Sequence, residues 1–214
     1  MTMVRARPPA RKSRWESSLL SALATPANIV LGGVAAFLLG LGIITALPAM
    51  IALARALTRW MRDKDDAVFT NTFREFASTW RRSLPLGIFA AFVTLVLAAD
   101  VFFLLVQMTT GSSTLVIVFA AAAVPIGVVF LLMLLAVPVA ASRLADETRR
   151  EWMNEVGNML LRHPGRSFAM LVVGAAITVG CALLPTLIPF VALSLPVYAG
   201  LRIWGYQLDS PAAE

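Results

Sequence analysis

Four long stretches without a charged side chain decide most of what this chain can fold into. They cover residues 17–54, 83–99, 101–142 and 167–201, and a membrane-spanning helix needs about 20 apolar residues. The 214 residues are 59% hydrophobic and 14% charged, whereas soluble domains are about 45–50% apolar and about 25% charged. A soluble core cannot bury so much apolar sequence, so we predict an all-α, polytopic transmembrane helix bundle.

Prolines divide the first and last stretches. As one helix, residues 27–54 would be about 42 Å long, and the hydrocarbon core is about 30 Å thick. Pro48 removes a backbone donor within this region and interrupts a helix there. Pro185 and Pro189 interrupt the last stretch in the same way. The sequence therefore predicts two proline-hinged hairpins, each a full span followed by a shorter return helix.

The placement of basic residues predicts the topology. Five of the 18 precede the first span, seven lie in residues 55–82, five lie in residues 143–166, and Arg202 stands alone. Six membrane-entering helices put every group, and both termini, on the cytoplasmic side, as the positive-inside rule favours. Five spans with an external N-terminus is the alternative. We divide the chain into a basic tail and interfacial segment (1–26), one transmembrane helical domain (27–209) and a C-terminal tail (210–214).

Two cytoplasmic segments are predicted to form amphipathic helices. In residues 68–82 the aromatic side chains fall on one helical face, since they are spaced by four, three and four; they are Phe69, Phe73, Phe76 and Trp80. Trp152 and Val156 begin a second such face. These faces either rest on the membrane surface, where anionic headgroups attract the nearby basic residues, or dock a cytoplasmic partner. Because the basic residues separate apolar runs, we do not expect nucleic-acid binding.

Several segments together resemble the YesL-like family of bacterial membrane proteins, a family of unknown function. They are "TALPA", "FREFASTWRRSL", "LLRHPGRSF" and "VYAGLRIWGYQLD", in this order. The resemblance covers most of the chain, but here the basic tail is longer and Leu47 replaces the usual Gly before Pro48. It implies a multi-spanning protein of the bacterial plasma membrane, often encoded beside sugar-uptake ABC transporters. It implies no reaction and no ligand residues.

Asp100 is an acidic residue inside an apolar run, where a carboxylate costs about 2.5–3.5 kcal/mol on insertion scales. Counted from the expected external turns, Asp100 and Arg55 lie at similar depth. We therefore expect the two side chains to pair within the membrane. A solute or proton path, or a carboxyl that faces the external surface, stays open as an alternative.

Small residues recur at every fourth position of two spans, a pattern that lets helices approach closely in lipid. They are Gly32, Ala36 and Gly40, then Gly174, Thr178 and Ala182. We expect packing within the chain, with self-association or docking on another membrane protein as the alternative.

No constellation of catalytic residues emerges from the sequence. A metal site is not expected, because the single histidine, His163, and the single cysteine, Cys181, lie far apart and zinc needs several ligands. No cofactor is expected either. The preferred hypothesis is a non-catalytic accessory protein of carbohydrate uptake by ABC-type transporters. The alternative is a small oligomeric transporter or channel, to which proline-broken helices are suited.

Overall fold

The computed structural model describes residues 14–110 and 114–205, and in this part of the chain helices are joined by short turns, with no strand. The elements follow in the order α1 (Arg14–Gly40), η1 (Ile43–Thr45), α2 (Ala46–Asp63), α3 (Val68–Thr110), α4 (Thr114–Arg143), α5 (Arg149–Arg162), α6 (Pro164–Leu183), η2 (Pro185–Leu187), α7 (Ile188–Val191) and α8 (Ser194–Gly205). The predicted tails at residues 1–13 and 210–214 lie outside the described residues.

Five helical segments are long and apolar enough to cross a membrane, which confirms the predicted class of fold. They lie in α1, in η1 with α2, in α3, in α4 and in α6. A sixth span is possible if the segments Pro185–Val191 and Ser194–Gly205, bent by 51° at their junction, are taken as one. Both predicted counts, five and six, are therefore compatible with the fold.

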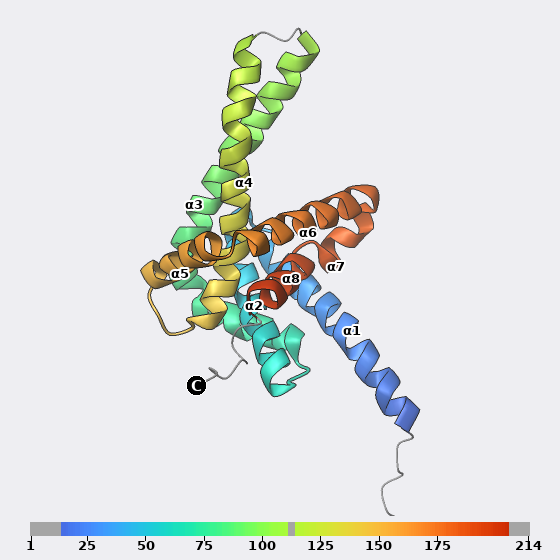
Figure 1. The fold of residues 1–214 in the computed structure, drawn as a ribbon. Helices are drawn as coiled ribbons and strands as arrows, with labels where there is room; N and C mark the ends of the chain where they lie inside the picture. The colour runs from blue at the N-terminus through green and yellow to red at the C-terminus, as the bar shows by residue number, and fades with distance from the viewer. Residues whose placement is uncertain (1–13, 111–113, 206–214) are drawn as a thin grey trace, which may run out of the picture.

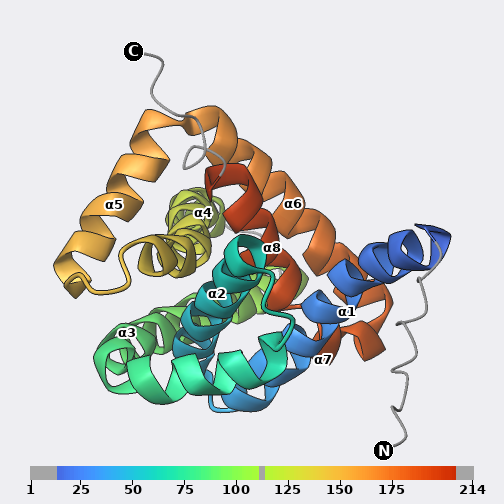
Figure 2. The ribbon, with the colours of Figure 1, turned by 90° about the horizontal axis from the view of Figure 1, so that it is seen from below.

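The helices surround α2, which packs against α1, α3, α4 and α8. In the candidate span that contains α2, 61% of the residues are buried, whereas the buried share is 6% in the candidate spans of α3 and α4. The outer halves of α3 and α4 form a long hairpin that projects beyond the other helices, and α6 lies across the axis of this hairpin (Figures 1 and 2). The apolar surface of the hairpin is therefore available to lipid or to another membrane protein.

The first hairpin turns before Pro48 and not at it. The helix breaks after Gly40, and Pro48 is the third residue of α2, where its missing N–H costs nothing because the first N–H groups of a helix lack intrahelical partners. At the turn, the Thr45 hydroxyl lies 2.7 Å from the Leu39 carbonyl oxygen, to which it can donate. This bond satisfies an acceptor that the end of α1 leaves open.

The turn of the first hairpin lies beside the middle of α3. A Cβ built on Gly87 would stand 2.3 Å from the Ile44 carbonyl oxygen. Gly87 follows Arg82 by five residues, about 7.5 Å of helix, and α3 continues for about 35 Å beyond it. The α1–α2 turn thus lies well short of the far end of α3, although α1 still contains a segment, Leu23–Gly40, that is long and apolar enough to cross a membrane.

The second hairpin breaks where the sequence predicts. α6 ends at Leu183, Pro185 begins η2, and Pro189 lies in the first turn of α7. The chain then returns through α8, whose Trp204 carbonyl accepts a hydrogen bond from Arg143 at the end of α4. The last helix therefore comes back to the end of the fold at which α4 finishes and α6 starts.

The predicted interfacial segment and the first span form one helix, α1, which passes through Pro26 without a break. Asn28 marks the point at which α1 joins the other helices, because its amide donates to Asp66 in the α2–α3 turn over 3.2 Å. The N-terminal end of α1 extends away from the other helices (Figure 1). α1 therefore runs without interruption across the predicted boundary at residue 26.

The amphipathic segment that begins at residue 68 is helical, as predicted, and continues into the span of α3 through Pro85. Its aromatic face points outward: Phe73 and Trp80 are exposed, and Phe69 and Phe76 are half-buried. The opposite face is polar and faces the other helices. A helix with its polar face inward and its aromatic face outward suits a lipid environment, in which apolar side chains gain nothing from burial among helices.

Candidate functional site

A buried polar face of α3 is the starting point of the candidate site. It consists of Asn71, Thr72, Glu75, Thr79 and Ser83. The hydroxyls of Thr72, Thr79 and Ser83 each donate to the carbonyl four residues earlier, over 2.7–3.0 Å. These hydroxyls are satisfied by their own helix. Glu75 is the charged member of the face and must find its partners on another helix.

Two arginines of α2 supply those partners. The Arg55 guanidinium lies 3.9 Å from the Glu75 carboxylate, and both side chains are only 11% exposed. Arg59 donates to the same carboxylate from a half-exposed position. Residues 55 and 59 lie on one face of α2 because they are four apart. This ionic contact joins the most buried helix, α2, to the longest one, α3.

Arg55 also holds the end of α4. Its guanidinium donates to the carbonyl of Ala141 over 3.2 Å and to that of Ala145 over 2.8 Å. Arg82 of α3 reaches the Ala145 carbonyl over 3.3 Å. The last carbonyls of a helix lack intrahelical donors and carry partial negative charge. Arg55 therefore caps the last turn of α4, and Arg55 and Arg82 together hold the turn that follows α4 through the Ala145 carbonyl.

Trp152 of α5 covers this cluster. Its ring is fully buried and lies 4.9 Å from the guanidinium carbon of Arg82 and 5.7 Å from that of Arg55, within the range of cation–π attraction. The indole N–H donates to the Leu144 carbonyl over 2.7 Å. A capping box starts α5, and hydrogen bonds from Thr148 hold the pKa of Glu151 below its usual value.

The structure does not bring Arg55 and Asp100 together. Arg55 is engaged by Glu75, whereas Asp100 is exposed and has no ion pair among the described residues. The prediction of this pair was wrong because it measured depth from Pro48 and took the α1–α2 turn to lie level with the far end of α3. The α1–α2 turn reaches only Gly87 of α3, so Arg55 lies near the basic end of the helices.

The face of α5 for which membrane contact and partner docking were the two alternatives is occupied by the chain itself. Trp152 and Val156 are fully buried, and α5 packs against α4. Its apolar face covers the end of α4 and is not open to a cytoplasmic partner. The aromatic face of α3 remains exposed, so the choice between membrane contact and docking stays open there.

The two small-residue stripes differ. Gly32 and Ala36 are buried, and a Cβ on Gly32 would stand 2.7 Å from Leu53; at Gly40 the nearest atom, on Ala46, is 3.4 Å away. In α6 Gly174 is buried, but Thr178 and Ala182 are exposed. Packing within the chain therefore uses the first stripe and not most of the second. No sequence pattern predicted the tightest contact of a described glycine, where a Cβ on Gly33 would meet the Phe190 carbonyl at 1.9 Å.

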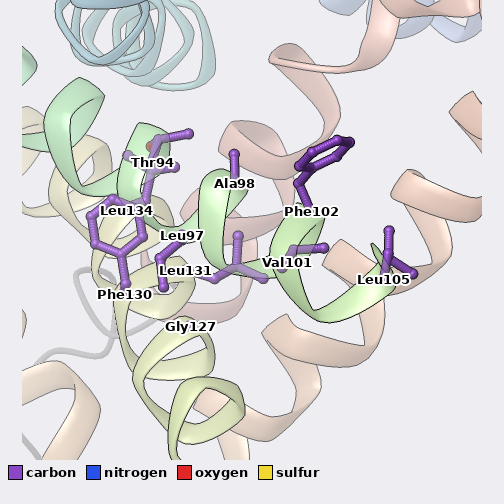
Figure 3. A pocket seen from close by; sticks show the side chains of 10 residues that line it. All are labelled: Thr94, Leu97, Ala98, Val101, Phe102, Leu105, Gly127, Phe130, Leu131 and Leu134. Atoms are coloured by element: carbon purple, nitrogen blue, oxygen red, sulfur yellow. The ribbon is translucent and has the colours of Figure 1, made fainter. Parts of the chain in front are cut away.

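An apolar groove of about 580 Å³ lies between α3 and α4 in the projecting hairpin. Residues of both helices line it, among them Leu97, Val101, Phe102 and Phe130 (Figure 3). Thr94 is its polar side chain, and the Thr94 hydroxyl donates to the carbonyl of Ala90. The groove thus suits an acyl chain or an apolar helix rather than a sugar.

The cluster around Arg55 holds neighbouring helices together, since each of its charges contacts a backbone carbonyl or an opposite charge on another element. Residues 14–110 and 114–205 contain no group of three or more His, Cys, Asp or Glu side chains able to hold a metal. Sequence reasoning missed Glu75 and Arg82. The signal for Glu75 was its position on the hydroxyl-bearing face of α3, opposite the aromatic residues.

These features define a polytopic helical membrane protein in which charged groups tie the helices together at one end. Residues 23–101 match the model of a family described as "Protein of unknown function, DUF624". The match includes α2 and the Glu75 face of α3. A search of curated proteins found no match, and neither did a search of solved structures.

Proposed function

We propose that this chain is a non-catalytic accessory protein of a bacterial plasma membrane, with both termini cytoplasmic, that associates with the permease subunits of an ABC-type carbohydrate uptake system. The resemblance to the YesL-like family supports the link to sugar uptake. The match of residues 23–101 to a family of unknown function agrees with that resemblance. The charged ends of the helices would face cytoplasmic headgroups.

The observation that carries this proposal is the contrast between the basic end and the projecting hairpin. The charged side chains around Arg55 are engaged in contacts with other helices of the same chain. The outer hairpin offers exposed apolar side chains such as Phe102 and Phe119. Because a monomer rarely exposes large continuous apolar surface except where it meets lipid or a partner, this hairpin is the surface we assign to a permease.

Purification in mild detergent tests the proposal. We expect a permease subunit to remain bound to the wild type and to be lost from Phe102→Ser on the hairpin. Phe168→Ser on α6 is the matched control, since Phe102 and Phe168 are 70% and 69% exposed. If Phe102→Ser keeps the permease and Phe168→Ser loses it, the permease contacts α6 and not the hairpin. Absence of any permease from the wild type would reject the accessory role.

A small oligomeric transporter or channel is the second candidate, and the broken helix between α7 and α8 favours it. The two segments meet at 51°, and broken helices build binding sites in transporters. Purified protein that self-associates without a permease and moves a solute into liposomes would establish this function in place of the accessory role.

A further inference from the structure

We propose that a second pocket, at the junction of α4, α5, α6 and α8, binds a phosphate group, most directly that of an anionic lipid headgroup. The pocket has a volume of about 220 Å³. Arg143, Arg162, His163, Arg166 and Trp204 line it together with Glu155. Figure 2 shows α4 and α8 between the diverging helices α5 and α6. This inference is independent of the accessory role proposed above.

Hydrogen-bond donors dominate the pocket. Glu155 is engaged by Arg143 over 3.2 Å. Arg162 and Arg166 have no ion pair within the described part of the chain. The pocket therefore carries an excess of guanidinium groups, and planar guanidinium groups are suited to bidentate binding of phosphate oxygens.

Two residues that line this pocket each carry a buried donor without an acceptor. These donors are the indole Nε1 of Trp204, a residue that is 2% exposed, and Nε of Arg143. Within residues 14–110 and 114–205, these are the buried side-chain nitrogen and oxygen atoms without a hydrogen-bond partner, and both residues line the same pocket. Because an unpaired buried donor costs free energy, this pair of atoms points to an acceptor-rich ligand.

The start of α6 also favours an anionic ligand. Pro164 is the first residue of this 20-residue helix, and Arg166 belongs to its first turn. The N-terminal end of a helix carries partial positive charge, which attracts anions; here the contribution is that charge, because Pro164 has no N–H and the N–H groups of Arg166 and Ser167 donate to the His163 carbonyl. The guanidinium groups, the unpaired donors and the helix start thus favour the same kind of ligand.

The position of the pocket favours a lipid as the source of the phosphate. It lies where α4 ends, α6 begins and α8 approaches its last residue. Two of these helices contain candidate spans and α8 completes a third, so the pocket lies at the level where apolar helices leave the membrane. Basic pockets between spans at the cytoplasmic side suit anionic headgroups.

Lipid retention measured by native mass spectrometry tests the assignment. Wild-type protein in detergent is given phosphatidylglycerol or phosphatidylcholine, and inorganic phosphate in a separate arm. We expect phosphatidylglycerol to be retained, and Arg162→Gln and Arg166→Gln each to weaken its binding by about tenfold, as loss of a charge-assisted hydrogen bond implies. Arg202→Gln is the matched control, because Arg202 is exposed on α8, pairs with Tyr198 and does not line the pocket.

Trp204→Phe separates hydrogen bonding from charge, since it removes the unpaired N–H and leaves the net charge unchanged. It should weaken phosphatidylglycerol retention as well, while elution in gel filtration stays that of the wild type. If inorganic phosphate stabilises the wild type and phosphatidylglycerol does not, the pocket takes a soluble phosphate. If Arg166→Gln and Arg202→Gln lower retention equally, or if phosphatidylcholine binds as well as phosphatidylglycerol, the assignment is wrong.

Discussion

Arg55 and Glu75 form the contact on which the basic end of the fold most depends. Each is largely removed from solvent, and Arg55 also caps α4. Taking away one member of a buried pair leaves the other charge without compensation and costs about 3–5 kcal/mol. Arg59 also donates to the Glu75 carboxylate, from a half-exposed position, so Glu75→Gln removes the charged partner of both arginines.

Glu75→Gln and Arg55→Gln should therefore each lower the free energy of unfolding in detergent by about 3 kcal/mol. The double variant should lose less than the sum of the two, because it no longer strands a charge. Asp100→Asn, at an exposed position, should stay within about 0.5 kcal/mol of the wild type. Denaturant titration followed by tryptophan fluorescence measures all four. Strict additivity of the two single changes would contradict this pairing.

The free energy of unfolding should depend on pH through Asp65, which lies in the turn between α2 and α3. Hydrogen bonds from the Asn71 amide and the Ala67 N–H lower the pKa of Asp65. Because its pKa is lower in the folded state, Asp65 stabilises the fold at pH values above its unfolded pKa of about 3.9. This stabilisation is lost as the pH falls through the folded pKa of Asp65. Unfolding at pH 3 and pH 6 should show a smaller pH dependence in Asp65→Asn than in the wild type. An unchanged pH dependence would contradict this role.

At the scale of helices, the sequence predicted where apolar segments lie better than where they end. Pro26, Pro85, Pro125 and Pro138 all lie inside helices, while the first break falls at Gly40 and not at Pro48. A proline within a lipid-facing helix is tolerated when neighbouring groups satisfy the freed carbonyl. Prolines alone therefore could not locate the turns, and the depth of Arg55 was misjudged for this reason.

Close approach of α1 to α7 should depend on Gly33. Gly33→Ala places a methyl group against the Phe190 carbonyl, and overpacking of this kind costs about 1–3 kcal/mol. Gly127→Ala is the matched control in α4, where no atom lies within 4 Å, and alanine there should gain about 0.5–1 kcal/mol through its helix preference. Thermal unfolding compares the two. Equal effects would mean that α1 and α7 do not pack as described.

The shallow turn of the first hairpin can be measured by fluorescence quenching. A fluorophore on Ile43→Cys, in a Cys181→Ser background, should be quenched by brominated lipid chains, because the turn lies beside Gly87 of α3. A fluorophore on Thr109→Cys, at the far end of α3, should be quenched by aqueous iodide. Stronger quenching by iodide than by lipid at residue 43 would mean that the hairpin crosses the membrane.

At the scale of the whole molecule, composition and charge placement predicted a helical membrane protein, and the fold confirms that class. The candidate site was less predictable. Apolar periodicity identified the aromatic face of α3 but not which face turns inward, because in lipid the inward face is the polar one. The partners of Arg55 lie 20 to 90 residues away in sequence, and no local pattern encodes such contacts.

We propose that every basic segment lies on one side of the membrane. The return of α8 to Arg143 supports an even number of crossings, although α6 lies across the long hairpin (Figure 1). Labelling of single cysteines in intact cells by an impermeant thiol reagent, in a Cys181→Ser background, is the most direct test. Ser78→Cys, Asn154→Cys and Ala212→Cys should be labelled only after the membrane is permeabilised, and Thr109→Cys before it. Labelling of residue 78, 154 or 212 from outside would contradict the claim.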